Sequence, residues 1–143
     1  MDAEQLLKDA PLFRGLDGKH LRMLAKMAHE RTFTRGEVIF REGDESFGMY
    51  IIASGQVEVV QERGGEEKVL ETRGPGQVFG EISVLVDHPR IATVRATMPT
   101  ECFVFSEWSF RDVLYRSPSM MRHLVRRLAR WVVNAEDRAA ASV

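Results

Sequence analysis

Short runs of strand-forming residues, separated by glycine and polar turn residues, fill the middle of the chain. Nine of the eleven glycines lie in Gly36–Gly80, and none follows. Gly64-Gly65 and Gly43-Asp44 each predict a tight reversal, because glycine adopts positive φ without strain. Roughly seven or eight antiparallel strands, arranged as a sandwich, jelly roll or barrel, fit this spacing. The clearest predicted strands are Glu37–Phe40, Met49–Ile52, Val57–Val60, Lys68–Leu70, Ala92–Thr97 and Glu101–Phe105.

Helical periodicity marks the two ends of the chain. Apolar residues recur at helical spacing in Leu16–Glu30, where Asp17 can cap the first turn. The segment Ser106–Tyr115 predicts a second helix whose opening serine is the cap. The pair Ser117-Pro118 is a typical cap and first position for a third helix, Pro118–Arg138. The predicted order is a helix, a β-rich body and two closing helices.

One face of the final helix carries an apolar stripe with a spacing near that of a coiled coil. Such a stripe packs on an apolar partner surface, so a homodimer through residues 121–135 is one hypothesis for its use. Scattered arginines occupy the other faces, which is typical of a solvated surface rather than one that binds nucleic acid or membrane. The stripe consists of Met121, Leu124, Val125, Leu128, Val132 and Ala135.

Length and composition favour one domain over residues 1–143, with helical residues 1–30, a β-rich body of 31–105 and closing helices in 106–138. The net charge of -1 gives no global positive field, so direct nucleic acid binding is not expected. No apolar run approaches the roughly 18 residues that cross a bilayer, so membrane insertion is not expected either. The single cysteine, Cys102, and the polar first residues indicate a cytoplasmic protein.

The segment from Gly80 to Arg90 carries residues suited to binding an anion. Gly80 lets a ligand approach the backbone, and Glu81–Leu85 can form one helical turn whose free N–H groups face a phosphate. The Arg90 guanidinium matches two phosphate oxygens in a planar fork. A carboxylate would repel a phosphate, so Glu81 is expected to accept from a hydroxyl such as that of a ribose. The set predicts a nucleotide site; a Glu81–Arg90 ion pair on the surface is the alternative.

Catalysis is not predicted. His88 lies near the proposed phosphate, but no nucleophile or metal-ligand set accompanies it. The four histidines show no spacing typical of metal ligands, so no metal site is expected. The histidine is therefore interpreted as a turn residue, and the protein as a binding module rather than an enzyme.

The cassette Phe79-Gly80-Glu81, followed by Pro89-Arg90 and Ala92–Ala96, resembles the cyclic nucleotide-binding domain family at matching spacing. Phe33–Asp44 and Met49–Val57 look like the early strands and turns of that family. The resemblance covers residues 12–133. It implies a mainly β fold, an eight-stranded antiparallel β-roll of jelly-roll type with an N-terminal helix and two C-terminal helices. Because only a few residues follow Arg138, a stand-alone domain without the DNA-binding helix-turn-helix of some relatives is expected, and a fragment of a larger regulator or channel is the alternative.

The resemblance implies a non-catalytic sensor in which residues 79–92 bind a cyclic nucleotide. Glu81 would accept from the ribose 2′-OH, and Arg90 would bind the exocyclic phosphate oxygens. Trp131 falls near the position whose side chain reaches the base, where the final helix would act as a lid and transmit the signal to an unknown downstream protein. Further contacts are implied for Phe79, Gly80, Ile82, Ser83, Ile91 and Ala92.

Ile91 stands where relatives that bind guanine commonly have a hydroxyl residue. The expected ligand is therefore cAMP, with cGMP as the second choice, and no other cofactor is expected. Ile91 is also bulkier than the usual residue and could crowd the pocket. The alternative is a degenerate family member that acts as a protein-interaction or dimerisation module without nucleotide binding.

Overall fold

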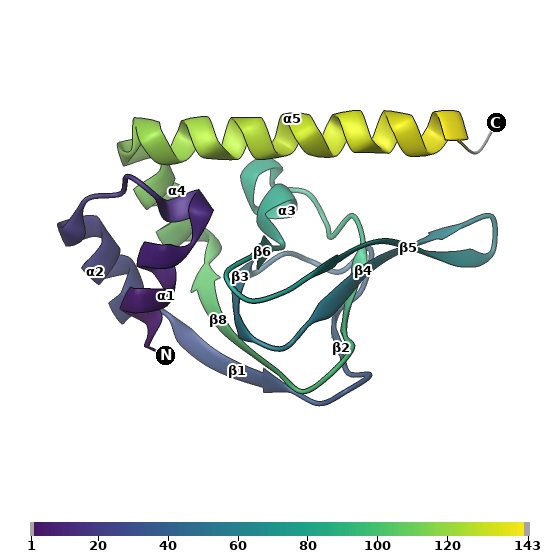
Figure 1. Cartoon of the computed structure of the whole chain (residues 1–143), viewed down its shortest axis with the longest axis horizontal. Helices are drawn as coiled ribbons and strands as arrows, with labels where there is room; N and C mark the ends of the chain where they lie inside the picture. Colours follow the sequence, from purple (N-terminus) through teal and green to yellow (C-terminus); the bar gives the residue numbers. More distant parts are fainter. Residues whose placement is uncertain (1, 142–143) are drawn as a thin grey trace.

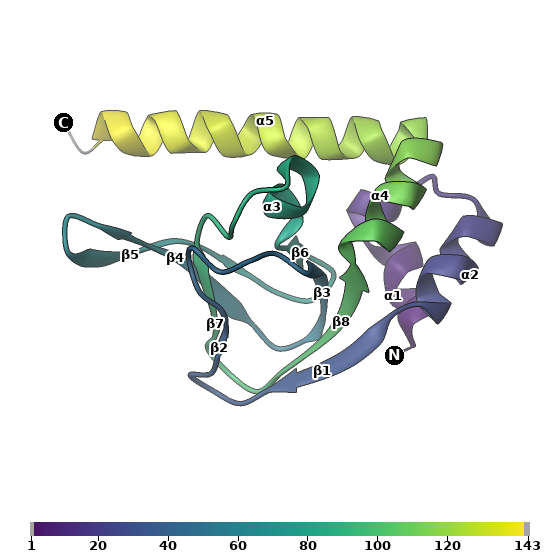
Figure 2. The ribbon, with the colours of Figure 1, turned by 180° about the vertical axis from the view of Figure 1, so that it is seen from behind.

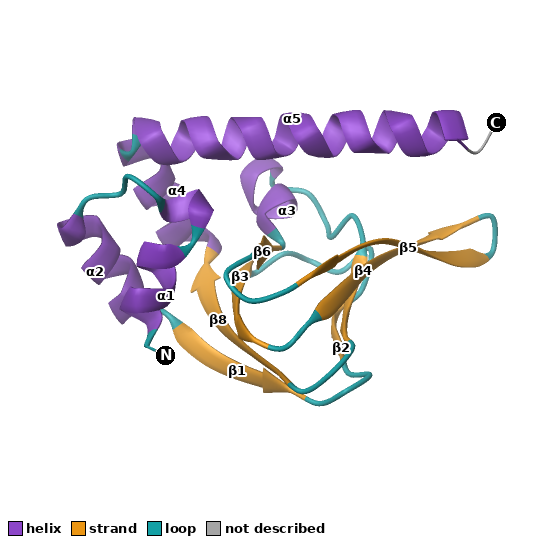
Figure 3. Ribbon diagram, in the orientation of Figure 1, coloured by secondary structure: helices purple, strands orange, loops and turns teal. Residues whose placement is uncertain are grey.

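Eight antiparallel strands form two four-stranded sheets in the computed structural model, which describes residues 2–141 (Figures 1 and 3). One sheet has the order β1-β8-β3-β6 and the other the order β2-β7-β4-β5. The strands are β1 His29–Phe33, β2 Val38–Phe40, β3 Gly48–Ser54, β4 Val57–Arg63, β5 Glu66–Arg73, β6 Val78–Phe79, β7 Thr93–Ala96 and β8 Thr100–Ser106. The predicted mainly β fold, a β-roll flanked by terminal helices, is confirmed.

Helices precede the roll, interrupt it once and close it. They are α1 Ala3–Asp9, the 3-10 turn η1 Pro11–Phe13, α2 Gly18–Lys26, α3 Glu81–Val86, α4 Glu107–Arg116 and α5 Pro118–Ala141. The predicted caps are confirmed, because the side chains of Asp17, Ser106 and Ser117 accept from the backbone N–H groups of the first turns they open. The predicted Gly64-Gly65 reversal joins β4 to β5, and both glycines have positive φ.

Two apolar clusters hold the elements together. The larger lies between the helices and the sheet of β3 and β8, where Phe13 packs against Phe105 and Phe110. The smaller fills the inside of the roll around Ile52, Phe79 and other strand residues. The nucleotide cassette predicted from the sequence begins at β6, so its first residue is anchored in the inner cluster.

Helix α5 lies across the top of the molecule, above α3 and the roll (Figures 1 and 2). Met120 and Leu124 are buried in the larger cluster, and Leu128 packs against it. The predicted apolar stripe is therefore split between two faces, because Val125 and Val132 are 57% and 53% exposed. Burial of one face against η1 and α4 leaves the second apolar face of α5 on the surface.

Two local predictions were wrong, and a third was confirmed only in part. The helix expected over Leu16–Glu30 ends at Lys26, because His29 begins a strand that pairs with β8. One N-terminal helix was expected, but α1 precedes it, opened by an Asp2 cap and followed by η1. The predicted Gly43-Asp44 reversal forms, with a φ of 91° at Gly43 and a hydrogen bond from the Asp44 N–H to the Arg41 carbonyl, but it does not join paired strands, because β2 and β3 lie in different sheets.

Cys102 is buried inside the roll, and burial raises the pKa of its thiol to about 12. The thiolate is the reactive form, and an ordinary thiol has a pKa near ~8.5. We therefore expect the native protein to react with a disulfide reagent at pH 8 at least ~100-fold more slowly than the urea-unfolded chain. Absorbance of the released thiolate measures both rates, and equal rates would contradict burial of this side chain.

Candidate functional site

The predicted cassette forms a tight turn between β6 and α3. Gly80 caps α3 with a φ of 82°, a left-handed conformation that favours glycine. A Cβ at this position would lie 2.6 Å from Nη1 of Arg90. The glycine therefore meets two requirements at once, since it permits the turn and leaves room for the arginine.

Arg90 is a buried cation whose hydrogen-bond acceptors among the described residues are all uncharged. Nη1 donates to the Gly80 carbonyl (2.9 Å) and to the Ser83 hydroxyl (3.0 Å), and Nη2 donates to the Gly48 carbonyl (2.6 Å). No ion pair joins Arg90 to a carboxylate within the described residues, and its buried Nε has no hydrogen-bond partner. Burial lowers the pKa of Arg90, and electrostatic interactions with Tyr50, Glu81 and Asp44 act in the opposite direction. A buried positive charge without a counterion favours binding of an anion.

An aromatic cluster holds the arginine in place. The Arg90 guanidinium carbon lies 4.0 Å from the ring centroid of Phe40. Phe40 packs against Tyr50 and Phe79, and the last two rings stack with centroids 4.8 Å apart. Burial raises the pKa of Tyr50, so its hydroxyl stays neutral near pH 7. The cluster gives the guanidinium a rigid, apolar support and a favourable cation–π contact.

Glu81 is buried beside the turn and is held by two arginines. Its Oε1 accepts from Nε of Arg127 (3.1 Å) and lies 3.6 Å from Nη1 of Arg73. Both arginines also donate to the carbonyl of Val78. No hydrogen bond within the described residues ends on Oε2 of Glu81, which leaves one carboxylate oxygen for another donor. The alternative of a Glu81–Arg90 ion pair on the surface is wrong, because both side chains are buried and they do not pair.

All of the predicted site residues line one small pocket of about 40 Å³. The structure thus brings Trp131 of α5 to the cassette, although the two are far apart in sequence. Their roles in ligand binding stay predictions. The lining residues predicted from the sequence are Phe79, Gly80, Glu81, Ile82, Ser83, Arg90, Ile91, Ala92 and Trp131, and those it missed are Phe40, Val59, Arg73 and Val94.

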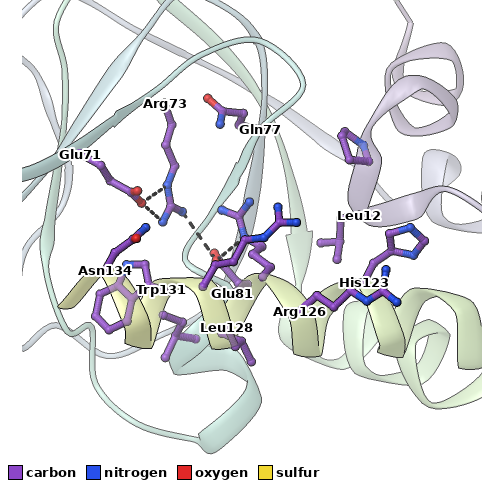
Figure 4. Close-up of a pocket in the computed structure, with 14 residues that line it drawn as sticks. Leu12, Glu71, Arg73, Gln77, Glu81, His123, Arg126, Leu128, Trp131 and Asn134 are labelled. Carbon is purple, nitrogen blue, oxygen red and sulfur yellow. Dashed lines mark hydrogen bonds and ion pairs between the residues drawn. The ribbon is translucent and has the colours of Figure 1, made fainter. Parts of the chain in front are cut away.

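A larger cleft of about 330 Å³ adjoins this pocket and shares Arg73, Glu81, Ile82 and Trp131 with it. Figure 4 shows the chain of contacts from Glu71 through Arg73 to Glu81 across the cleft. Sequence reasoning missed the role of Arg127, which is an ordinary helix-surface residue by pattern. Arg127 reaches Glu81 only because α5 packs over the cassette, and nothing in the cassette sequence predicts that packing.

Similar proteins were found by sequence and by structure. Residues 30–117 match the family described as Cyclic nucleotide-binding domain. A cyclic AMP receptor protein of Thermus thermophilus is 31% identical over 131 residues, which cover 91% of this chain and 61% of that protein.

Two solved structures resemble this one. The catabolite activator protein of Thermus thermophilus has a TM-score of 0.81, with 30% identity over 92% of this chain and 62% of that chain. The regulatory domain of Toxoplasma gondii PKA, solved with cAMP, has a TM-score of 0.74 and 31% identity over 78% of this chain and 42% of that chain. In each case this chain spans less than two thirds of the relative.

The part of the chain that the structure describes contains neither a membrane-spanning helix nor a cluster of metal-ligand side chains. No helix there is both long and apolar enough to cross a membrane. No group of three or more His, Cys, Asp or Glu side chains there could hold a metal ion.

Gly80 and Gly76 form a matched pair for testing the packing of Arg90. Both have a φ of 82°, but a Cβ at Gly76 would meet nothing within 4 Å. Gly76→Ala is expected to cost only the backbone strain, about 1 kcal/mol of unfolding free energy. Gly80→Ala must also displace Arg90, so we expect a further loss of about 1–3 kcal/mol in urea unfolding. Equal losses in the two variants would show that Arg90 does not pack against Gly80.

Proposed function

Because the chain belongs to the cyclic nucleotide-binding domain family, we propose that it is a non-catalytic sensor of a cyclic nucleotide, with cAMP as its ligand. The observation that carries this proposal is the buried Arg90, which has three neutral acceptors and, in the part of the chain that the structure describes, no carboxylate partner. A cyclic phosphate has one negative charge and two exocyclic oxygens. It would neutralise the guanidinium and could accept from Nε, which has no hydrogen-bond partner among the described residues.

Glu81 suits the ribose of the same ligand. Arg127 and Arg73 bind its Oε1 and keep the carboxylate fixed, which leaves Oε2 to accept from the 2′-hydroxyl. The two arginines also offset the repulsion between the carboxylate and a nearby phosphate. Glu81 and Arg90 therefore lie in one pocket without pairing with each other, so that one can bind the ribose and the other the phosphate.

The preference for cAMP over cGMP rests on Ile91. Its side chain lines the pocket and offers no hydroxyl to a guanine. Its carbonyl accepts from Nε2 of Gln61 at 2.8 Å, a bond that ties the loop to β4. An apolar side chain at this position favours adenine, because it offers no hydrogen bond to a guanine.

Ligand entry requires the pocket to enlarge, which supports a signalling role for α5. The pocket of about 40 Å³ is far below the ~300–1,000 Å³ of typical small-molecule sites. Trp131 lines both the pocket and the larger cleft, and Arg127 joins α5 directly to Glu81. Binding would therefore shift Trp131 and the contacts of α5, and the ligand would stabilise the conformation it binds better.

Calorimetric titration of cAMP into the wild-type protein and Arg90→Lys tests the phosphate site. Lysine keeps the charge but loses the planar fork, so we expect binding at least about tenfold weaker. Arg95→Lys is the matched control, because Arg95 pairs with Glu58 and Glu67 and does not line the pocket. No binding of cAMP or cGMP to folded wild-type protein would instead favour the alternative, a degenerate member that acts as an interaction module.

The ribose role has its own test in 2′-deoxy-cAMP. Loss of the hydroxyl should weaken binding to the wild-type protein by about tenfold, since it leaves a buried carboxylate oxygen unpaired. Glu81→Gln should bind both nucleotides with affinities closer to each other than the wild type does. An unchanged ratio of the two affinities in Glu81→Gln would contradict the role of Glu81.

We also infer that two copies of the chain associate through α5. The supporting observation is the exposed apolar face of this helix, on which Val125 and Val132 are seven residues apart. Ala129, which is also exposed, lies between them, so the face continues at spacings of four and three residues. This is the period of a coiled-coil seam, and it fits a second α5.

Val132→Glu should convert a dimer to a monomer, because it places a charge in the apolar seam. Val86→Glu is the matched control, since Val86 is also an exposed helical valine but lies in α3. Sedimentation equilibrium measures the mass of both variants. A monomeric wild-type protein at high concentration would contradict association through α5.

A further inference from the structure

The large cleft beside the cassette pocket has more positive than negative side chains. Its walls come from α5, from β5 and the turn after it, from the start of α3 and from η1. Four arginines and one histidine face two glutamates. Both glutamates are already paired, Glu71 with Arg73 and Glu81 with Arg73 and Arg127. The cleft therefore holds uncompensated positive charge.

Arg126 and Arg130 are the source of this charge. Each lines the cleft, and no hydrogen bond or ion pair joins either of them to another residue in the described part of the chain. They are four residues apart on one helix, so their like charges repel each other. A bound anion between the two guanidinium groups would relieve this repulsion.

The cleft adjoins the cassette pocket near Trp131 but extends further along α5. Its lining residues on α5 run from His123 to Asn134, about 16 Å along a helix that rises ~1.5 Å per residue. Arg126 and His123 lie more than one turn before Trp131, the residue that reaches the cassette pocket. His123 donates from Nδ1 to the Ser119 carbonyl (2.8 Å), because a carbonyl can only accept. The part of the cleft that lies before Trp131 along α5 is thus basic, and His123 is held there by this hydrogen bond.

We propose that this cleft is a second anion site, in which Arg126 and Arg130 bind a phosphate group of a molecule distinct from the nucleotide in the cassette pocket. Guanidinium groups match phosphate oxygens in number and geometry, and two of them suit a group with more than one negative charge. Leu12 and Leu128 supply apolar walls, so the phosphate-bearing molecule can also carry an apolar part. The site does not require that the cassette bind a nucleotide.

Pyrophosphate is the probe for this site, titrated calorimetrically at a constant ionic strength of about 0.15 M. The wild-type protein should bind it saturably at one site. The variant Arg126→Gln/Arg130→Gln should bind it at least about tenfold more weakly. The matched control Arg35→Gln/Arg122→Gln removes the same charge from two exposed arginines that do not line the cleft, and it should bind as the wild type does. Circular dichroism checks that all three proteins are folded.

Several outcomes would overturn the proposal. No binding, or equal binding by all three proteins, would mean that the cleft does not select a phosphate. Displacement of pyrophosphate by cAMP would assign it to the cassette pocket instead. Binding of cAMP to the wild-type protein is measured separately, so failure of the proposed sensor function and failure of the second anion site give different results.

Discussion

A positive charge buried without a counterion is the constraint on which the site depends. Removing a guanidinium from water costs several kcal/mol, and hydrogen bonds to neutral carbonyl and hydroxyl oxygens offset only part of that cost. The residues around Arg90 hold its guanidinium in this buried position. Gly80 turns with positive φ, Ser83 is small and polar, and the Phe40 ring lies under the guanidinium. The protein thus keeps an anion-binding group in position before any ligand arrives.

Glu81 connects this cassette to the rest of the molecule. It belongs to the same short helix as Ser83, yet its Oε1 is bound by Arg127 of α5 and lies near Arg73 of β5. A ligand that engages the free Oε2 would therefore act on a group that already holds α5. The contact gives the cassette a direct physical link to the helix on which both the proposed dimer face and the basic cleft lie.

Local signals in the sequence predicted more of the fold than long-range ones. The caps at Asp17, Ser106 and Ser117 follow from the chemistry of a single turn, so they were predicted correctly. Strand β1 was missed because its pairing partner, β8, lies about seventy residues away and no local pattern records it. The α5 stripe was predicted as one face, but packing buries Leu124 and exposes Val125.

The distinction between local and long-range signals also applies to the site. The cassette residues lie close together in sequence and match a family pattern, so they could be identified in advance. Phe40, Arg73 and Arg127 reach the site from separate elements, and each has an ordinary position in its own strand or helix. Trp131 was identified through the resemblance alone, and the fold places it against the cassette.

Nitrogen-edited NMR of the arginine side chains would test the central claim, that an anionic ligand supplies the missing partner of Arg90. The Nε–H signal of Arg90 is identified by its loss in Arg90→Lys. On saturation with cAMP, we predict that this signal moves downfield and exchanges more slowly with solvent, because Nε then donates to a phosphate oxygen. An unchanged Arg90 signal, while the signals of other pocket residues shift, would contradict the claim.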